Sequence, residues 1–102
     1  MATLDQLFRR GFSEETRQLV WQKAQSVPGK DPNIMRFDTC GAYIHRDQYG
    51  VTTNNGKGWE IDHIIPTSRG GSNHISNLQP LQWQNNRAKG NGGPVCPVKA
   101  AA

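Results

Sequence analysis

The stretch Trp59-Glu60-Ile61-Asp62-His63-Ile64-Ile65-Pro66 decides the fold expected for this 102-residue chain. Residues 59–65 are rich in bulky apolar side chains and are predicted to form a strand. Strict alternation along a strand would aim Asp62 and His63 at opposite faces. For both to serve one site the strand must end or bulge at this point, and Pro66, which cannot continue a ladder, favours an ending.

About twenty residues downstream the chain supplies amide and basic side chains in Asn85-Asn86-Arg87-Ala88-Lys89-Gly90. The segment from Pro80 or Leu81 to Lys89 is predicted to be a short helix, with Gly90 suited to a left-handed conformation after it. If this helix packs back on the strand, Asn86 approaches Asp62. Carboxylate and amide oxygens can hold a divalent cation, and a neutral imidazole can activate a water. Together these groups indicate hydrolysis of a phosphodiester, in which the cation neutralises charge that develops on oxygen.

Two further elements are expected before this stretch. Ser13, followed by Glu14 and Glu15, is typical of a helix start, so residues 14–26 are predicted to be an amphipathic helix that ends before Pro28-Gly29. Residues 42–46 have the alternation of a strand, and the turn-rich residues 48–58 would connect it to residues 59–65 as a β-hairpin with a long loop.

The length and composition favour one small domain with a modest core. No run approaches the roughly 18 apolar residues that a membrane helix needs. The N-terminal residues 1–10 also lack the apolar segment of a signal peptide. A cytoplasmic location without membrane association is therefore expected.

Cys40 and Cys96 are the only cysteines. Nothing in the sequence places them together, and two reduced thiols are the expectation. Because no Cys-x-x-Cys pair exists, a structural zinc is not expected.

The charge is unevenly distributed along the chain. Residues 1–62 carry equal numbers of acidic and basic side chains, whereas residues 63–102 contain four basic residues and no Asp or Glu, which accounts for the net charge of +4. A basic half beside a candidate cation site suits a polyanionic partner, although a solvated basic surface without a ligand is an equal alternative on charge alone.

The order and spacing of four segments resemble the HNH endonuclease family. The segments are Asp62-His63-Ile64-Ile65-Pro66, Gly70-Gly71, Asn77-Leu78-Gln79-Pro80-Leu81 and Asn86-Arg87-Ala88-Lys89-Gly90. The resemblance implies an α+β domain with a ββα-metal (His-Me finger) core at residues 40–90. Residues 1–39 would add an N-terminal helix and connector that pack on the core, in place of the zinc knuckles that many members carry, and residues 91–102 would form a flexible tail.

The resemblance also implies a role for each motif residue. His63 would be the general base, and Asp62 and Asn86 would ligate one Mg²⁺ or Mn²⁺. Asn77 would brace the loop and fix the His63 backbone or ring without touching the metal. Asn86 stands where many members have a histidine, and oxygen ligands favour a harder ion than zinc; Asn85 is its local competitor. The candidate phosphate contacts are Arg46, Lys57, Arg69, Arg87 and Lys89.

Glu60 shares a strand face with Asp62. It is expected to support another site residue or to pair with an arginine, in preference to ligating the cation. The function expected from the resemblance is metal-dependent cleavage of DNA by a single-metal mechanism, in isolation, as a homodimer or within a larger complex. The alternatives are an HNH-like module that binds nucleic acid without cutting it, and a protein-interaction domain with a relic site.

Overall fold

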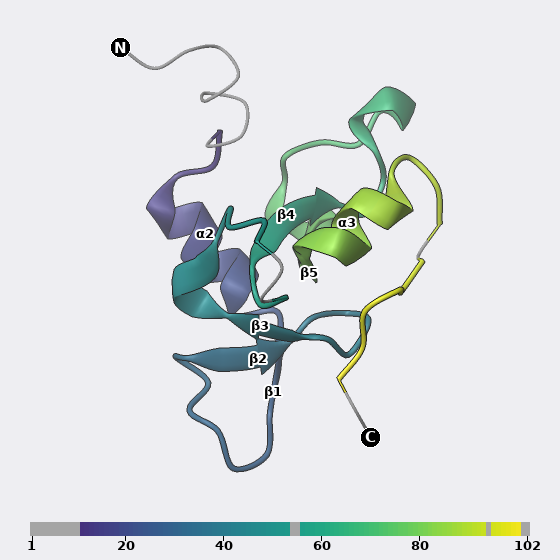
Figure 1. The fold of residues 1–102 in the computed structure, drawn as a ribbon. Coiled ribbons are helices and arrows are strands. Elements are labelled where there is room, and N and C mark those ends of the chain that lie inside the picture. Colours follow the sequence, from purple (N-terminus) through teal and green to yellow (C-terminus); the bar gives the residue numbers. More distant parts are fainter. Residues whose placement is uncertain (1–10, 54–55, 94, 101–102) are drawn as a thin grey trace.

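The computed structural model describes residues 11–53, 56–93 and 95–100, which form two helices and two small antiparallel sheets (Figure 1). In chain order the elements are α2 (Glu14–Trp21), β1 (Gln25–Ser26), β2 (Met35–Phe37), β3 (Tyr43–His45), β4 (Trp59–His63), β5 (Leu78–Gln82) and α3 (Trp83–Lys89). Three 3-10 turns lie between them, at Arg46–Gln48, Thr67–Arg69 and Ile75–Asn77. The expected α+β class is confirmed.

Helix α2 begins as expected and ends earlier than expected. The Ser13 hydroxyl accepts a hydrogen bond from the Thr16 amide, which caps the first turn. The helix stops at Trp21 and not at residue 26, and the chain continues into β1. The guanidinium of Arg36 donates to the carbonyl oxygens of Gln22 and Ala24, at 3.2 and 3.0 Å, and so satisfies groups that a longer helix would have bonded internally.

The strands pair differently from the expected hairpin. Strand β3 joins β1 and β2 in one sheet, in the order β1-β2-β3, while β4 pairs with β5 in the other. The predicted pairing of residues 42–46 with residues 59–65 is therefore wrong. In the actual register Asp62 lies opposite Gln79 and His63 lies opposite Leu78. The second strand of the ββα unit is therefore β5, which directly follows Asn77.

The second correction concerns residues 78–82, because the sequence predicts a helix that starts at Pro80 or Leu81. They form β5, and α3 begins only at Trp83. Pro80 suits the first turn of a helix, but it also fits an edge strand, because the edge that faces away from the partner needs no N–H. Pro80 lies opposite Ile61 in this two-stranded sheet. Most residues of β5 are buried, and this burial favours a strand over a helix at residues 78–82.

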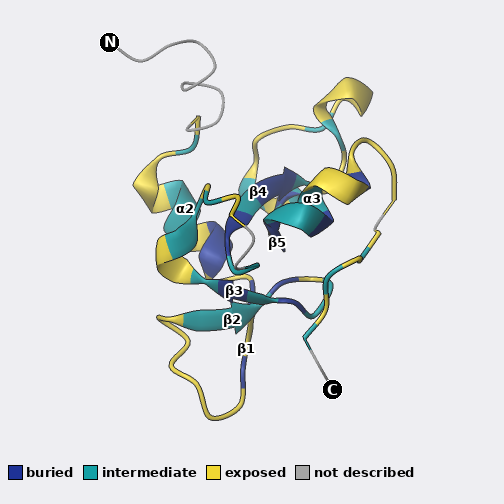
Figure 2. Ribbon diagram, in the orientation of Figure 1, coloured by how far each residue is buried: buried dark blue, intermediate teal, exposed yellow. Residues whose placement is uncertain are grey.

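The hydrophobic core lies between α2 and the two sheets. Trp21 and Trp59 are its largest members, with ring centroids 5.5 Å apart, and both are almost fully buried. Buried positions concentrate along β4 and at the C-terminal end of α2 (Figure 2). Helix α2 thus packs on the ββα unit that β4, β5 and α3 form. The shared core holds in place the strand that carries Asp62 and His63.

The C-terminal segment is attached to the core by several contacts. Cys96 forms a disulfide with Cys40, so the expectation of two reduced thiols is wrong for this structure. The buried Asn85 amide exchanges hydrogen bonds with the backbone of Val98, at 2.9 and 2.8 Å, and the Ala100 amide donates to Gly41. The described part of the segment expected to be loose therefore makes defined contacts. The division at residues 1–39, 40–90 and 91–102 stays a prediction.

Candidate active site

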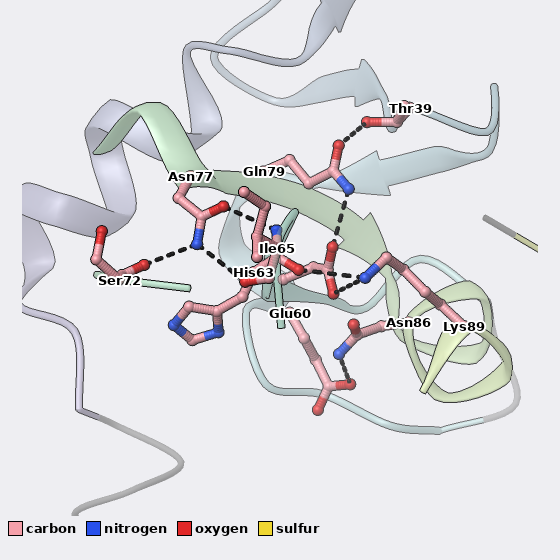
Figure 3. Close-up of polar contacts among 10 residues, drawn as sticks. Thr39, Glu60, His63, Ile65, Ser72, Asn77, Gln79, Asn86 and Lys89 are labelled. Carbon is pink, nitrogen blue, oxygen red and sulfur yellow. Dashed lines mark hydrogen bonds and ion pairs between the residues drawn. The ribbon is translucent and has the colours of Figure 1, made fainter. Parts of the chain in front are cut away.

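The end of β4 carries Asp62, whose carboxylate is held by two side chains from neighbouring elements. Lys89, on α3, places its ammonium 3.3 Å from Oδ1, and Gln79, on β5, donates from Nε2 to Oδ2 at 2.8 Å. The Gln79 amide is fixed in turn by Thr39, whose hydroxyl donates to Oε1 (Figure 3). Asp62 is only 6% exposed and Lys89 only 7%. The register that sets Gln79 opposite Asp62 is what builds this arrangement.

His63 points away from this buried pair. Its Nε2 lies 2.6 Å from the Asn73 side-chain oxygen, and its ring packs against Phe12 with centroids 5.9 Å apart. Because an amide oxygen only accepts, Nε2 must carry the proton of the neutral ring, which leaves the lone pair on Nδ1. The strand ends at His63, two residues before the predicted end at residue 65 and at the point where a shared site requires an ending. An imidazole held in this tautomer can take a proton at Nδ1.

Asn86 lies on α3 and meets Glu60 of β4. The Asn86 amide donates from Nδ2 to Glu60 Oε1 at 3.0 Å, and Arg87 pairs with both carboxylate oxygens of Glu60, at 3.1 and 3.0 Å. The expected pairing of Glu60 with an arginine is confirmed. Glu60, His63, Asn86 and Arg87 line one hollow of about 240 Å³. Asp62 is not among the residues that line it.

Asn77 braces the loop that follows β4. Its Oδ1 accepts from the Ile65 amide at 2.8 Å, and its Nδ2 donates to the carbonyl oxygens of Ile65 and Ser72 (Figure 3). The loop passes so closely that a Cβ at Gly71 would lie 1.7 Å from the Ile65 oxygen. Asn77 contacts the loop as expected, but its side-chain partners are Ile65 and Ser72 and not the backbone or ring of His63.

The five basic residues expected to contact phosphates have different surroundings. Arg69 and Arg46 are exposed, with Arg46 donating to the Gln18 side chain at 2.9 Å, and Lys57 is half-buried. The Arg87 guanidinium is at the hollow, where the hydrogen bonds that it donates to the Glu60 carboxylate raise its pKa. Lys89 is buried against Asp62, so its ammonium is not on the surface in this structure.

Tyr49 forms another wall of the hollow. Burial raises the pKa of its phenol, an effect that the nearby Arg17 opposes. The phenol is therefore protonated at neutral pH and lines the hollow as an uncharged group.

The donor chemistry at this site fits a hard divalent cation. Asp62 lies on β4 and Asn86 on α3, two elements that are in contact, and they supply carboxylate and amide oxygens. Each Asp62 oxygen makes one contact in the structure and keeps a further lone pair. Among the described residues no three His, Cys, Asp or Glu side chains gather as a metal cluster. A cation here would rely on two protein oxygens and on water.

Sequence reasoning missed the groups that orient the motif residues. Gln79, Thr39 and Asn73 act through side-chain amides and a hydroxyl, which carry no periodic signal. Gln79 could have been found from the correct register, since it stands directly opposite Asp62. Asn85, the alternative to Asn86 as the site amide, is buried and bonds to Asp38 and Val98.

No helix in the described part of the chain has the length and apolar character needed to span a membrane.

Comparison with known proteins agrees with the motif. A family model described as HNH endonuclease matches residues 39–92, which is more than half of the chain and includes β3, β4, β5 and α3. No curated protein and no solved structure matches the chain. With a ββα unit that carries the Asp62-His63 pair, Asn77 and Asn86 in the matched region, this chain belongs to the HNH endonuclease family.

Proposed function

We propose that this protein is a metal-dependent endonuclease that hydrolyses phosphodiester bonds in DNA with a single divalent cation and His63 as general base. Membership of the HNH endonuclease family supports nuclease activity. The observation that carries the finer proposal is the shared hollow: His63, Asn86 and Arg87 come from two elements and line the same space of about 240 Å³.

His63 is oriented for proton abstraction. The contact of Nε2 with Asn73 keeps the unprotonated Nδ1 for a water, and Phe12 packs on the ring and limits its rotation.

Asp62 and Asn86 would hold the cation, Mg²⁺ or Mn²⁺. When bound, it would stabilise negative charge on the phosphate and on the leaving oxygen. Lys89 already neutralises the buried Asp62 carboxylate, so the Lys89 ammonium and the divalent cation would share this carboxylate. Asn77 would act indirectly, by fixing the loop that follows His63.

Arg87 is placed to receive a phosphate of the substrate. Its side chain is half-exposed and lines the hollow while it pairs with Glu60, so one face of the guanidinium remains open to a second anion. Arg69, Arg46 and Lys57 would contribute contacts to the DNA backbone outside the hollow.

The proposal is tested by cleavage of a supercoiled plasmid with Mg²⁺, with Mn²⁺ and with EDTA. Wild-type protein should nick or linearise the plasmid only with a divalent cation, and His63→Ala should lower the rate by about 10²-fold or more. His74→Ala is the matched control, because His74 is an exposed loop histidine and should cleave like wild type.

Retardation of the plasmid by wild-type protein with no cleavage under any cation would contradict the proposal. It would favour the alternative of a module that binds nucleic acid without cutting it. Cleavage that survives in His63→Ala would leave the nuclease and remove the assigned base.

A further inference from the structure

Glu60 occupies a central position among the polar contacts of the hollow. Its Oε1 accepts from Asn86 Nδ2 at 3.0 Å and from Arg87 Nε at 3.1 Å, while its Oε2 accepts from Arg87 Nη2 at 3.0 Å. The Glu60 side chain is 22% exposed. Three of the roughly four acceptor positions of a carboxylate are thus filled by protein donors.

This arrangement selects one of the two orientations of the Asn86 amide. An ionised carboxylate only accepts hydrogen bonds, so the amide must turn its NH₂ group toward Glu60. The opposite orientation would bring the amide oxygen against the carboxylate oxygen, two negative atoms at hydrogen-bond distance. With Nδ2 committed to Glu60, the Asn86 oxygen is the atom left for another partner.

We infer that Glu60 is a positioning residue that fixes the Asn86 amide with its oxygen available to the divalent cation. The inference rests on the proposed function, which assigns the cation to Asp62 and Asn86. Figure 3 shows the Glu60 and Asn86 side chains directed toward each other from β4 and α3, with the Glu60 carboxylate on the side away from Gln79.

Arg87 makes Glu60 suitable for this role. The guanidinium contacts both carboxylate oxygens in a two-point geometry, which restricts rotation of the carboxylate as well as neutralising it. The raised pKa of Arg87 has the same physical origin, the hydrogen bond and the charge of Glu60. The adjacent residues Asn86 and Arg87 therefore both donate to the Glu60 carboxylate. Helix α3 supplies the Asn86 amide and also the Arg87 guanidinium that fixes this carboxylate.

If Glu60 had only a structural role, its replacement would not change the affinity for the cation. If Glu60 were itself a ligand, its effect on that affinity would not depend on Asn86. A double-variant cycle on cation affinity separates these cases. Mn²⁺ binding to the intact chain without DNA is measured by electron paramagnetic resonance of free Mn²⁺, for wild type, Glu60→Leu, Asn86→Ala and the double variant. Leucine removes the acceptor oxygens and has an apolar side chain of similar size.

Glu60→Leu should weaken Mn²⁺ binding by about tenfold, the effect typical of losing a partner that orients a ligand. In the Asn86→Ala background the same change should have less than a twofold effect, because the amide it orients is already absent. Glu60→Gln should fall between wild type and Glu60→Leu, since its amide can still accept from Nδ2 but no longer excludes the reversed orientation. Glu15→Gln, an exposed glutamate on α2, is the control and should bind like wild type.

Three results would overturn the inference: wild type that binds no Mn²⁺, a Glu60→Leu variant that is folded and binds Mn²⁺ like wild type, or a loss in Glu60→Leu that recurs in full without Asn86. The last result would make Glu60 a direct ligand. Circular dichroism and thermal unfolding confirm that each variant is folded. Plasmid cleavage is scored separately, so protein that shows the expected Mn²⁺ pattern without cleaving DNA would contradict the proposed function and leave this inference standing.

Discussion

Lys89 and Asp62 form a buried ion pair, with 3.3 Å between the ammonium nitrogen and Oδ1. The ammonium also donates to the His63 carbonyl oxygen at 3.2 Å. Removal of one partner from such a pair leaves an uncompensated charge in a region that is largely shielded from water, and that cost exceeds the value of the interaction itself.

Lys89→Met is therefore expected to lower the free energy of unfolding by about 3 kcal/mol. Adding Asp62→Asn removes the stranded charge while keeping an acceptor for Gln79, and should recover more than half of the loss. Urea unfolding of both variants measures this. Lys30→Met, at an exposed lysine, should stay within about 0.5 kcal/mol of wild type. A Lys89→Met variant as stable as wild type would show that the ammonium is not a structural counter-ion.

The close passage of the loop at Gly71 leads to a second prediction. A Cβ there would lie 1.7 Å from the Ile65 oxygen and 2.9 Å from Asn77 Nδ2, so Gly71→Ala must displace the loop that follows His63. We expect a loss of about 1–3 kcal/mol in the free energy of unfolding and a lower cleavage rate.

Gly93→Ala is the matched control for this change, because nothing lies within 4 Å of a Cβ at that position. Amide spectra of both variants show whether the disturbance is local. Shifts confined to residues near position 71, with the Ile65 and Asn77 resonances unchanged, would contradict the bracing role of Asn77.

The start of β4 and the end of α3 were more predictable from the sequence than the strand pairing was. Both follow local rules: apolar residues along the strand, and a glycine after the helix at Gly90. Pairing is a long-range property. The predicted strands at residues 42–46 and 59–65 follow one another along the chain, which favours a hairpin, whereas β4 pairs with the mostly buried strand β5.

Pro80 misled for a related reason, since one residue type is favourable both at a helix start and on an edge strand. Only tertiary burial distinguishes the two. The Asn86 contact with Glu60 was equally out of reach, because it depends on the rotation of α3 about its axis when it packs on β4.

The disulfide between Cys40 and Cys96 supports a third prediction. It closes a loop of 56 residues in sequence separation, and the chain-entropy argument assigns it about 4 kcal/mol of stability. Wild type treated with a reductant and the double variant Cys40→Ser/Cys96→Ser should lose similar amounts in urea unfolding. The reductant should have no effect on the double variant.

Thiol titration under non-reducing conditions tests the same point directly. Both cysteines should be unreactive, and two titratable thiols would restore the expectation from the sequence. The cytoplasmic location stays a prediction, and thiols there are normally kept reduced. The stability of the reduced protein is therefore the quantity that decides whether the fold tolerates that compartment.

The N-terminal helix supplies Val20 and Trp21, and the turn after it supplies Ala24, to a core cluster of seven buried residues. Such a contribution is what a segment must make if it is to replace zinc-based packing in a small domain.

A chain that lacks residues 1–30 is accordingly expected to lose cooperative unfolding, and Trp21→Ala alone should cost about 4 kcal/mol. Leu19→Ala, on the same helix at a side chain that is 48% exposed, should cost less than a quarter of that. Thermal unfolding followed by calorimetry distinguishes these outcomes. A truncated chain with one sharp transition near the wild-type temperature would show that the ββα unit and the disulfide suffice, and that the helix serves another purpose.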